Sequence, residues 1–177
     1  MKYAAAFGVV VLALSQMGGC VSGTINNNDV TLAVTSRVSL TSTQGESNGN
    51  SGLASVSSDG RRIAFVSQAK NLHPDDPDGL KDIFVRDMET HTLLLVSRAS
   101  GEAGVKGNAD SDNPMISADG NCVALQSLAS TLDPANDASS DSDVYLRNLT
   151  TNQTILISRA TGLSGAKGFR TAGGYLS

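Results

Sequence analysis

The sequence predicts an all-β protein built from β-propeller blades, and two observations carry this prediction. The first is an internal repeat: Val56-Ser57-Ser58-Asp59-Gly60 returns 60 residues later as Ile116-Ser117-Ala118-Asp119-Gly120. The second is a series of short apolar runs separated by turn residues, which is typical of strands. A repeat of this length is one supersecondary unit. Four short antiparallel strands repeated head to tail describe propeller blades.

In the first copy we expect strands at residues 53–57, 62–68, 82–88 and 93–98. Asp59-Gly60 predicts a tight turn between the first two, because glycine accepts a positive φ. Ile63 and Phe65 alternate with Ala64 and Val66 along the second strand. A strand that is apolar on both faces is covered on both faces.

The second copy predicts strands at residues 114–117, 121–126, 143–148 and 154–159. No segment holds a helical period over three turns, which excludes a helical solenoid. The main alternative to blades is a β-sandwich made of two duplicated sheets.

The repeat divides the chain into segments. We expect a signal peptide at 1–20, a tether at 21–29, a partial blade at 30–52, one blade at 53–112, a second at 113–162, and the start of a further blade at 163–177. Propellers close with roughly four to eight blades. We therefore expect either a truncated reading frame, which the break inside a repeat favours, or copies that associate to complete a ring.

Composition narrows the function. The chain has 177 residues, of which 40% are hydrophobic and 4% aromatic, and its net charge is −4. Binding to a phosphate backbone needs clustered Lys and Arg. Because the chain has no basic block, we expect no nucleic-acid partner.

The N-terminus carries a targeting signal. The apolar run from Ala4 to Leu14 is too short to span a bilayer but suits a signal peptide. Met17-Gly18-Gly19-Cys20 resembles a bacterial lipobox, which implies lipidation of Cys20 and, with Val21 following, an outer-membrane anchor. Plain secretion and a buried N-terminal segment are the alternatives.

Cys122 is interpreted as a passive thiol, with a disulfide to Cys20 or a reactive thiol as alternatives.

Several motifs of the repeat carry a family resemblance. The Ser-x-Asp-Gly turn, Ala64-Phe65-Val66-Ser67, the Asn71-Leu72-x-Pro74 loop and Asp82-Ile83-Phe84-Val85-Arg86-Asp87 resemble the WD-like repeats of TolB-type bacterial propellers, over about residues 30–162. The resemblance implies a non-catalytic scaffold of the cell envelope, facing the periplasm or the cell surface, that binds a protein or a glycan. The alternatives are the propeller remnant of a peptidase or other hydrolase, and a calcium-binding adhesion module.

Residues 75–82 form the sharpest candidate for a metal site. The closely spaced carboxylates around Gly79 resemble the calcium loops of other propellers, with Asp76, Asp78 and Asp82 as ligands and a backbone carbonyl near Leu80. Plain turn chemistry explains Asp and Gly equally well. The second copy keeps three acidic residues without the glycine: Asp137, Asp141 and Asp143. We expect no other cofactor.

Other motifs point to structure. Gly45-Glu46-Ser47-Asn48-Gly49 matches a nucleophile elbow, but that motif needs a strand turning into a helix. We therefore expect no catalytic residue, and we interpret His73 and His91 as solvated loop residues. The glycine-rich segments 101–107 and 162–168, which hold Lys106 and Lys167, are expected to connect blades.

Two arginine positions recur in both copies. Arg86 is repeated as Arg147, and Arg98 as Arg159. We expect them to form hydrogen bonds between blades, with a peptide-binding rim as the alternative.

Overall fold

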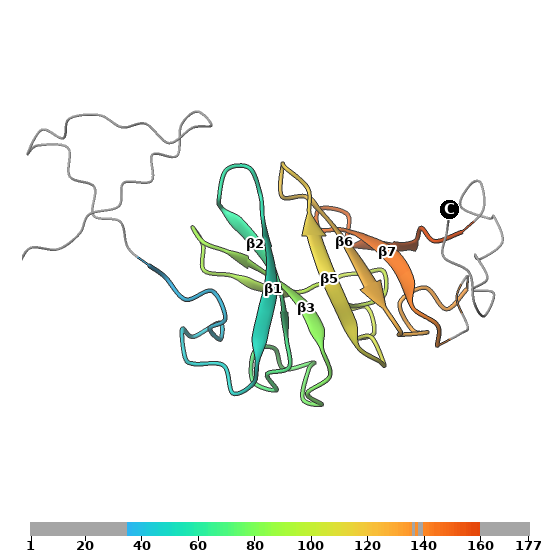
Figure 1. Ribbon diagram of the computed structural model, residues 1–177, viewed down its shortest axis with the longest axis horizontal. Coiled ribbons are helices and arrows are strands. Elements are labelled where there is room, and N and C mark those ends of the chain that lie inside the picture. Colours follow the sequence, from blue (N-terminus) through green and yellow to red (C-terminus); the bar gives the residue numbers. More distant parts are fainter. Residues whose placement is uncertain (1–34, 136, 138–139, 160–177) are drawn as a thin grey trace, which may run out of the picture. The chain divides into compact units, whose positions relative to one another are not determined.

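A computed structural model describes residues 35–135, 137 and 140–159 (Figure 1). The predicted signal peptide, Cys20, the tether and residues 163–177 lie outside the described residues. The chain divides into two compact units, residues 1–37 and 38–177, and the eight strands of the described part belong to the second. A search of that part for a helix long and apolar enough to cross a membrane finds none.

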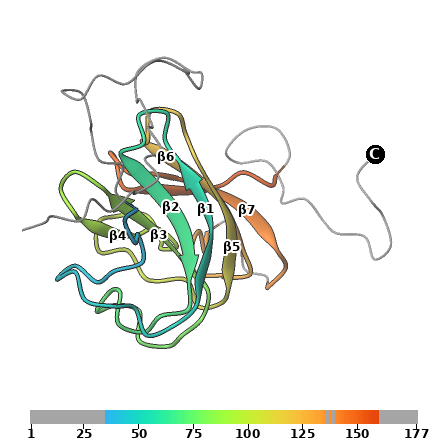
Figure 2. The ribbon, with the colours of Figure 1, turned by 60° about the vertical axis from the view of Figure 1, so that its left-hand side comes forward.

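The strands form two four-stranded antiparallel sheets, each in the order of the sequence (Figures 1 and 2). The first sheet consists of β1 (Ser51–Val56), β2 (Arg62–Ser67), β3 (Asp82–Asp87) and β4 (Leu93–Leu95). The second consists of β5 (Ser111–Ile116), β6 (Cys122–Ser127), β7 (Asp143–Asn148) and β8 (Gln153–Leu156). The predicted all-β fold with four-stranded blades is confirmed, and we refer to the two sheets as blade 1 and blade 2.

The Asp-Gly turns join the first two strands of each blade as predicted. Gly60 and Gly120 have φ values of 71° and 72°. The Ser57 hydroxyl donates to Asp59 Oδ1 at 2.6 Å, and the same carboxylate oxygen accepts the Arg61 N–H at 3.0 Å. A side chain that bonds the backbone two residues on is the mechanism that makes Asp a turn residue.

The first strand of each blade contains a β-bulge that the sequence did not predict. In blade 1 the register shifts between the pairs Gly52–Val66 and Ser55–Ala64, and blade 2 shows the equivalent shift between Asp112 and Met115. Leu53 and Asn113 lie at the equivalent bulge positions, with φ values of 46° and 51°. A bulge inserts an unpaired residue and twists the strand. β1 begins at Ser51 and β5 at Ser111, which is earlier than the predicted residues 53 and 114.

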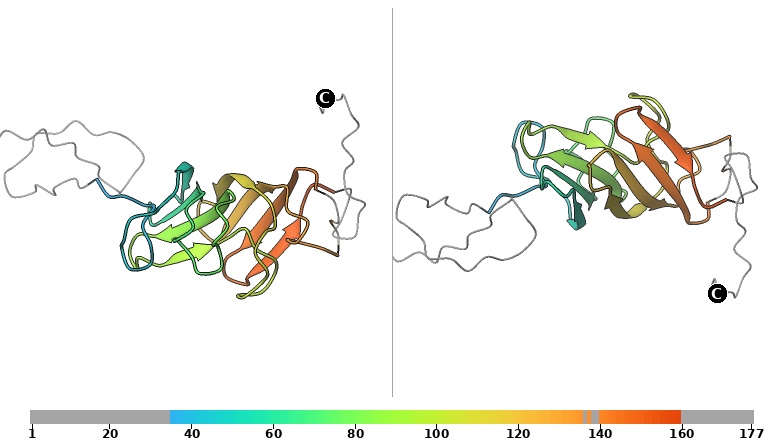
Figure 3. Two further views of the ribbon diagram at one scale, coloured as in Figure 1. Left: turned by 90° about the horizontal axis from the view of Figure 1, so that it is seen from below. Right: turned by 90° about the horizontal axis from the view of Figure 1, so that it is seen from above.

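The two blades share one hydrophobic core. The sheets lie close together at their first strands, where β5 contacts β1, β2 and β3 (Figure 3). The core joins apolar side chains of both blades: Ala64, Val66, Ile83, Val85, Val96, Val123, Leu125, Ala129, Leu132, Tyr145 and Leu156. On the opposite face of blade 1, Phe65 and Phe84 belong to a second cluster with Leu95, against which Val38 packs. The two central strands of blade 1, β2 and β3, are covered on both faces, as the sequence predicted.

Of the repeated arginines, Arg86 and Arg147 donate hydrogen bonds to the segment that precedes their blade. Arg98 and Arg159 do not form the expected bonds between blades but pair with Asp75 and Asp133 of their own blades. Arg86 donates to His91 O at 2.7 Å and also to the carbonyl oxygens of Val38 and Leu40, which precede blade 1. Arg147 donates to Ala99 O at 2.8 Å and to Gly101 O at 3.0 Å, on the segment that leaves blade 1. Both side chains are almost fully buried. Arg86 and Arg147 therefore each attach a blade to the segment before it.

Candidate binding groove and acidic loop

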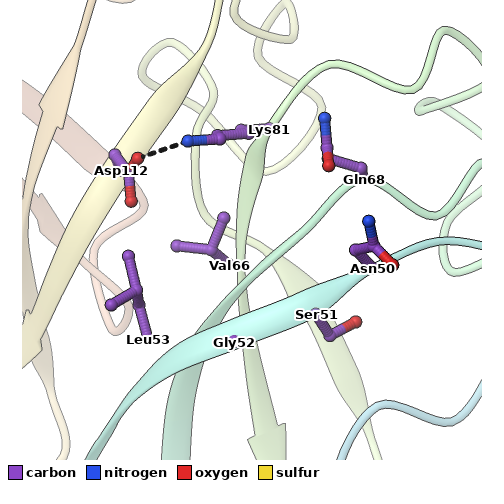
Figure 4. A pocket seen from close by; sticks show the side chains of 8 residues that line it. All are labelled: Asn50, Ser51, Gly52, Leu53, Val66, Gln68, Lys81 and Asp112. Carbon is purple, nitrogen blue, oxygen red and sulfur yellow. Dashed lines mark hydrogen bonds and ion pairs between the residues drawn. The ribbon is translucent and has the colours of Figure 1, made fainter.

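A shallow groove follows the line where β1 meets β5. It consists of two adjoining depressions of about 230 and 290 Å³. Figure 4 shows the first, lined by residues in or beside β1 and β2, by Lys81 just before β3, and by Asp112 from β5. Leu53 lines both depressions, and Pro114 and Met115 close the second. We call this feature the inter-blade groove.

The inter-blade groove combines exposed apolar side chains with an ion pair. Leu53 and Met115 are 59% and 70% exposed, and both line the second depression. Lys81 Nζ lies 2.9 Å from Asp112 Oδ2 and so joins the two blades across the first depression (Figure 4). The hydrogen bond of this pair raises the pKa of Lys81 and lowers that of Asp112, so both groups stay charged.

The bulge determines how Leu53 is presented. A leucine at positive φ carries steric strain, and strained residues concentrate at functional sites. Leu53 lies at this bulge with its side chain exposed and not in the core. No sequence pattern predicts this bulge, because it depends on the pairing of β1 with β2.

The acidic loop between β2 and β3 gathers the three predicted ligands. One carboxylate oxygen from each of Asp76, Asp78 and Asp82 lies within 4.8 Å of the other two. Asp76 and Asp82 are completely buried, whereas Asp78 is exposed. Gly79 adopts a φ of 78°, and the Leu80 N–H donates to Asp78 Oδ1 at 2.9 Å. We call these three residues the carboxylate cluster.

Lys106 inserts into the carboxylate cluster, which the sequence analysis missed. Its ammonium nitrogen lies 2.7 Å from Asp82 Oδ2, 3.0 Å from Asp78 Oδ2 and 3.5 Å from Asp76 Oδ1. It also donates to Gly107 O at 3.1 Å, and its side chain is only 10% exposed. Residue 106 is 24 or more positions from the cluster in sequence, so only the packing of the inter-blade segment brings it there.

Burial governs the protonation of the cluster. Burial, followed by the nearby charge of Asp82, raises the pKa of Asp76 to about 7. Burial also raises the pKa of Asp82, although Lys106 and the Ser97 hydroxyl, which donates at 2.6 Å, oppose this. Burial would lower the pKa of Lys106, but the hydrogen bond to Asp82 raises it overall. Lys106 is therefore a cation held among carboxylates.

The equivalent loop of blade 2 is arranged differently. Asp137 accepts a hydrogen bond from the Tyr145 hydroxyl, and Asp143 accepts one from the Ser158 hydroxyl at 2.7 Å. Asp141 is exposed. Among residues 35–135, 137 and 140–159, the cluster in blade 1 is the one group of acidic, histidine or cysteine side chains close enough to share a metal ion.

The other candidate residues belong neither to the inter-blade groove nor to the carboxylate cluster. Ser47 lies before β1 in a segment without strand or helix, so the turn that a nucleophile elbow requires is not formed there. His73 is in the β2–β3 loop and accepts the Asp75 N–H at 3.2 Å, and burial lowers its pKa. His91 lies in the β3–β4 turn at a φ of 59°. Cys122 is a half-buried free thiol in β6.

Comparison with known proteins finds likeness among solved structures. No protein-family model matches the chain, and no curated protein matches it in sequence. Among solved structures, TolB from Acinetobacter baumannii is similar, with a TM-score of 0.40 and 20% identity, over 66% of this chain. The chain spans 23% of the length of that protein. At this level of similarity no functional residue is transferred.

Proposed function

We propose that this chain is part of a non-catalytic β-propeller scaffold that binds a protein of the bacterial cell envelope at the inter-blade groove. The observation that carries the proposal is the exposure of Leu53 and Met115 beside the Lys81–Asp112 pair. Apolar side chains next to a few charged groups are typical of protein-binding surfaces.

The groove favours a protein over a glycan. Sugar rings are commonly held against exposed aromatic faces. The aromatic side chains within the described part of the chain are Phe65, Phe84 and Tyr145, and all three are buried in the cores. Leu53 and Met115 instead offer flexible apolar contacts, and methionine adapts well to protein surfaces.

Site-specific photo-crosslinking tests the groove. A photoreactive amino acid replaces Leu53 in the full chain expressed in a Gram-negative host, and the same residue replaces Leu94 as a control. Leu94 is 44% exposed but lies on β4, at the other edge of blade 1. We expect a discrete adduct from position 53 that M115D abolishes, and none from position 94. The same adduct from both positions, or none from position 53, would contradict the proposal.

The envelope location of this scaffold rests on the N-terminal residues. We propose that Cys20 carries the lipid anchor, because Met17-Gly18-Gly19-Cys20 is similar to a lipobox. Labelling with a palmitate analogue tests it: the native chain takes up label and C20A does not, whereas C122A does. Equal labelling of the native chain and C20A would exclude this anchor without affecting the proposal for the groove.

A further inference from the structure

When its three carboxyl groups are ionised, the carboxylate cluster holds more negative charge than Lys106 can balance. Asp76, Asp78 and Asp82 face a single ammonium, that of Lys106. Two of the three carboxylates are fully buried. Burying unbalanced charge is costly, because the low-polarity interior replaces none of the lost hydration. A cation with two charges would balance the cluster better than lysine does.

Asp76 supplies a second, separate observation. Its side chain is completely buried, and neither carboxylate oxygen accepts a hydrogen bond. Its nearest cation, Lys106 Nζ, is 3.5 Å from Oδ1, which is long for a charged pair. Buried polar groups nearly always have hydrogen-bond partners, so a buried carboxylate with a long ion pair and no hydrogen bond suits a more closely bound cation.

The spacing of the oxygens suits one metal ion. Calcium binds oxygens at about 2.3–2.6 Å, so two ligands of the same ion are at most about 5 Å apart. The carboxylate oxygens of the cluster lie within 4.8 Å of one another. Asp82 is also oriented from outside, because its Oδ1 accepts the hydrogen bond from Ser97 at 2.6 Å. Such outer hydrogen bonds are usual for metal-binding carboxylates.

Lys106 Nζ lies where such an ion would lie, at 2.7–3.5 Å from all three carboxylates. We propose that the carboxylate cluster is a divalent-cation site whose position is taken by Lys106 in the metal-free chain, so that the metal and the lysine exclude each other. Calcium is the expected ion, because an all-oxygen site on an irregular loop suits its flexible coordination better than the strict octahedron of magnesium.

The exclusion has a consequence for the connection between blades. Lys106 lies on the segment between β4 and β5. Its backbone forms an antiparallel bridge with that of Arg98, and the Gly107 N–H donates to Ser97 O at 2.9 Å. Metal binding releases Lys106 from the carboxylate cluster. Lys106 therefore holds this segment to the cluster in the metal-free chain but not in the metal-bound chain.

Isothermal titration of the full chain with CaCl₂ tests the proposal. The variant K106Q removes the competing ammonium, and we expect it to bind calcium roughly tenfold more tightly than the native chain, or more. K70Q is the matched control: it removes one positive charge from the exposed Lys70 on the same loop, so it binds as the native chain does. The double variant K106Q/D78N loses one exposed ligand, and we expect its binding to disappear.

Three results would overturn the proposal. They are no calcium binding by K106Q, equal affinity of K106Q and the native chain, or undiminished binding by K106Q/D78N, which would place the ion elsewhere. If K106Q does not fold without metal, its melting temperature is measured against CaCl₂ concentration. Recovery of a cooperative transition with calcium supports the proposal, and its absence at every concentration contradicts it. None of these outcomes bears on the inter-blade groove.

Discussion

Arg147 Nη1 lies 2.8 Å from the carbonyl oxygen of Ala99, so a buried side chain of blade 2 holds the backbone that leaves blade 1. The same guanidinium also donates to Gly101 O, Thr154 Oγ1 and Asn152 Oδ1. Burial lowers the pKa of Arg147, yet its partners are neutral oxygens that all accept from it. Arg147 therefore supplies hydrogen bonds to backbone carbonyl oxygens of the segment that leaves blade 1.

We therefore expect R147M to destabilise the chain by about 3 kcal/mol, because it leaves two backbone carbonyls unsatisfied. Urea unfolding followed by circular dichroism measures this. R61M is the control: Arg61 is half-exposed, its partner Glu89 is exposed, and its buried partner Asp87 keeps the N–H groups of Glu89 and Thr90. Surface pairs contribute little, so a much smaller loss is expected. Equal losses in the two variants would contradict the role of Arg147.

Asp87 predicts a pH dependence. Burial would raise its pKa, but the N–H groups of Thr90 and Glu89 and the guanidinium of Arg61 lower it to about 2. A carboxylate whose pKa falls on folding stabilises the fold above its unfolded pKa, near 4, and that contribution is lost as the pH falls toward 2.

D87N tests this dependence with little disturbance, because Asn148 is the equivalent residue of blade 2 and accepts the equivalent N–H groups of Thr150 and Thr151. We expect the urea midpoint of the native chain to fall more steeply between pH 4 and pH 2 than that of D87N, with the gap between the two closing toward pH 2. Parallel curves would contradict the prediction.

The strained bulge predicts an unusual effect of glycine. A left-handed conformation costs a residue with a Cβ about 1–2 kcal/mol, whereas glycine adopts it freely. Leu53 has a φ of 46°, so L53G is expected to be about as stable as L53A or up to about 1 kcal/mol more stable. At Leu94, in the ordinary strand β4, glycine is expected to be less stable than alanine by about 1 kcal/mol. The same order at both positions would show that Leu53 is not strained.

Removal of the Tyr145 hydroxyl group is expected to lower the free energy of unfolding. It is fully buried and donates to Asp137, whose carboxylate is also buried. Y145F leaves that carboxylate with one hydrogen bond fewer, so we expect a loss of about 1–3 kcal/mol of unfolding free energy. A neutral Y145F would contradict this role of the hydroxyl.

The strands could be predicted because short apolar runs and turn residues, which define them, are local features of the sequence. β7 has the predicted bounds, and the third strand of blade 1 ends one residue early, at Asp87. The fourth strands are shorter than predicted, ending at Leu95 and Leu156, because the chain leaves the sheet after them. The backbone of Arg98, for example, forms a bridge with that of Lys106 and not with a residue of β3.

The sites were only partly readable. The carboxylate cluster could be predicted because its three residues lie close together in the sequence, on the β2–β3 loop and at the first position of β3. Lys106 could not, since it reaches the cluster through packing of the inter-blade segment. The inter-blade groove could not either, because it depends on two bulges and on the approach of β5 to β1.

The central claim is that the two copies of the repeat pack face to face as consecutive blades. The most direct measurement is of nuclear Overhauser effects in the isotope-labelled full chain. Ser58 and Ala118 are joined by two hydrogen bonds, of 2.9 Å from the amide and 2.8 Å from the hydroxyl of Ser58, and Tyr145 shares its core with Val85. We predict cross-peaks between Ser58 and Ala118 and between the Tyr145 ring and the Val85 methyl groups. Cross-peaks confined to residues within each copy would contradict the account.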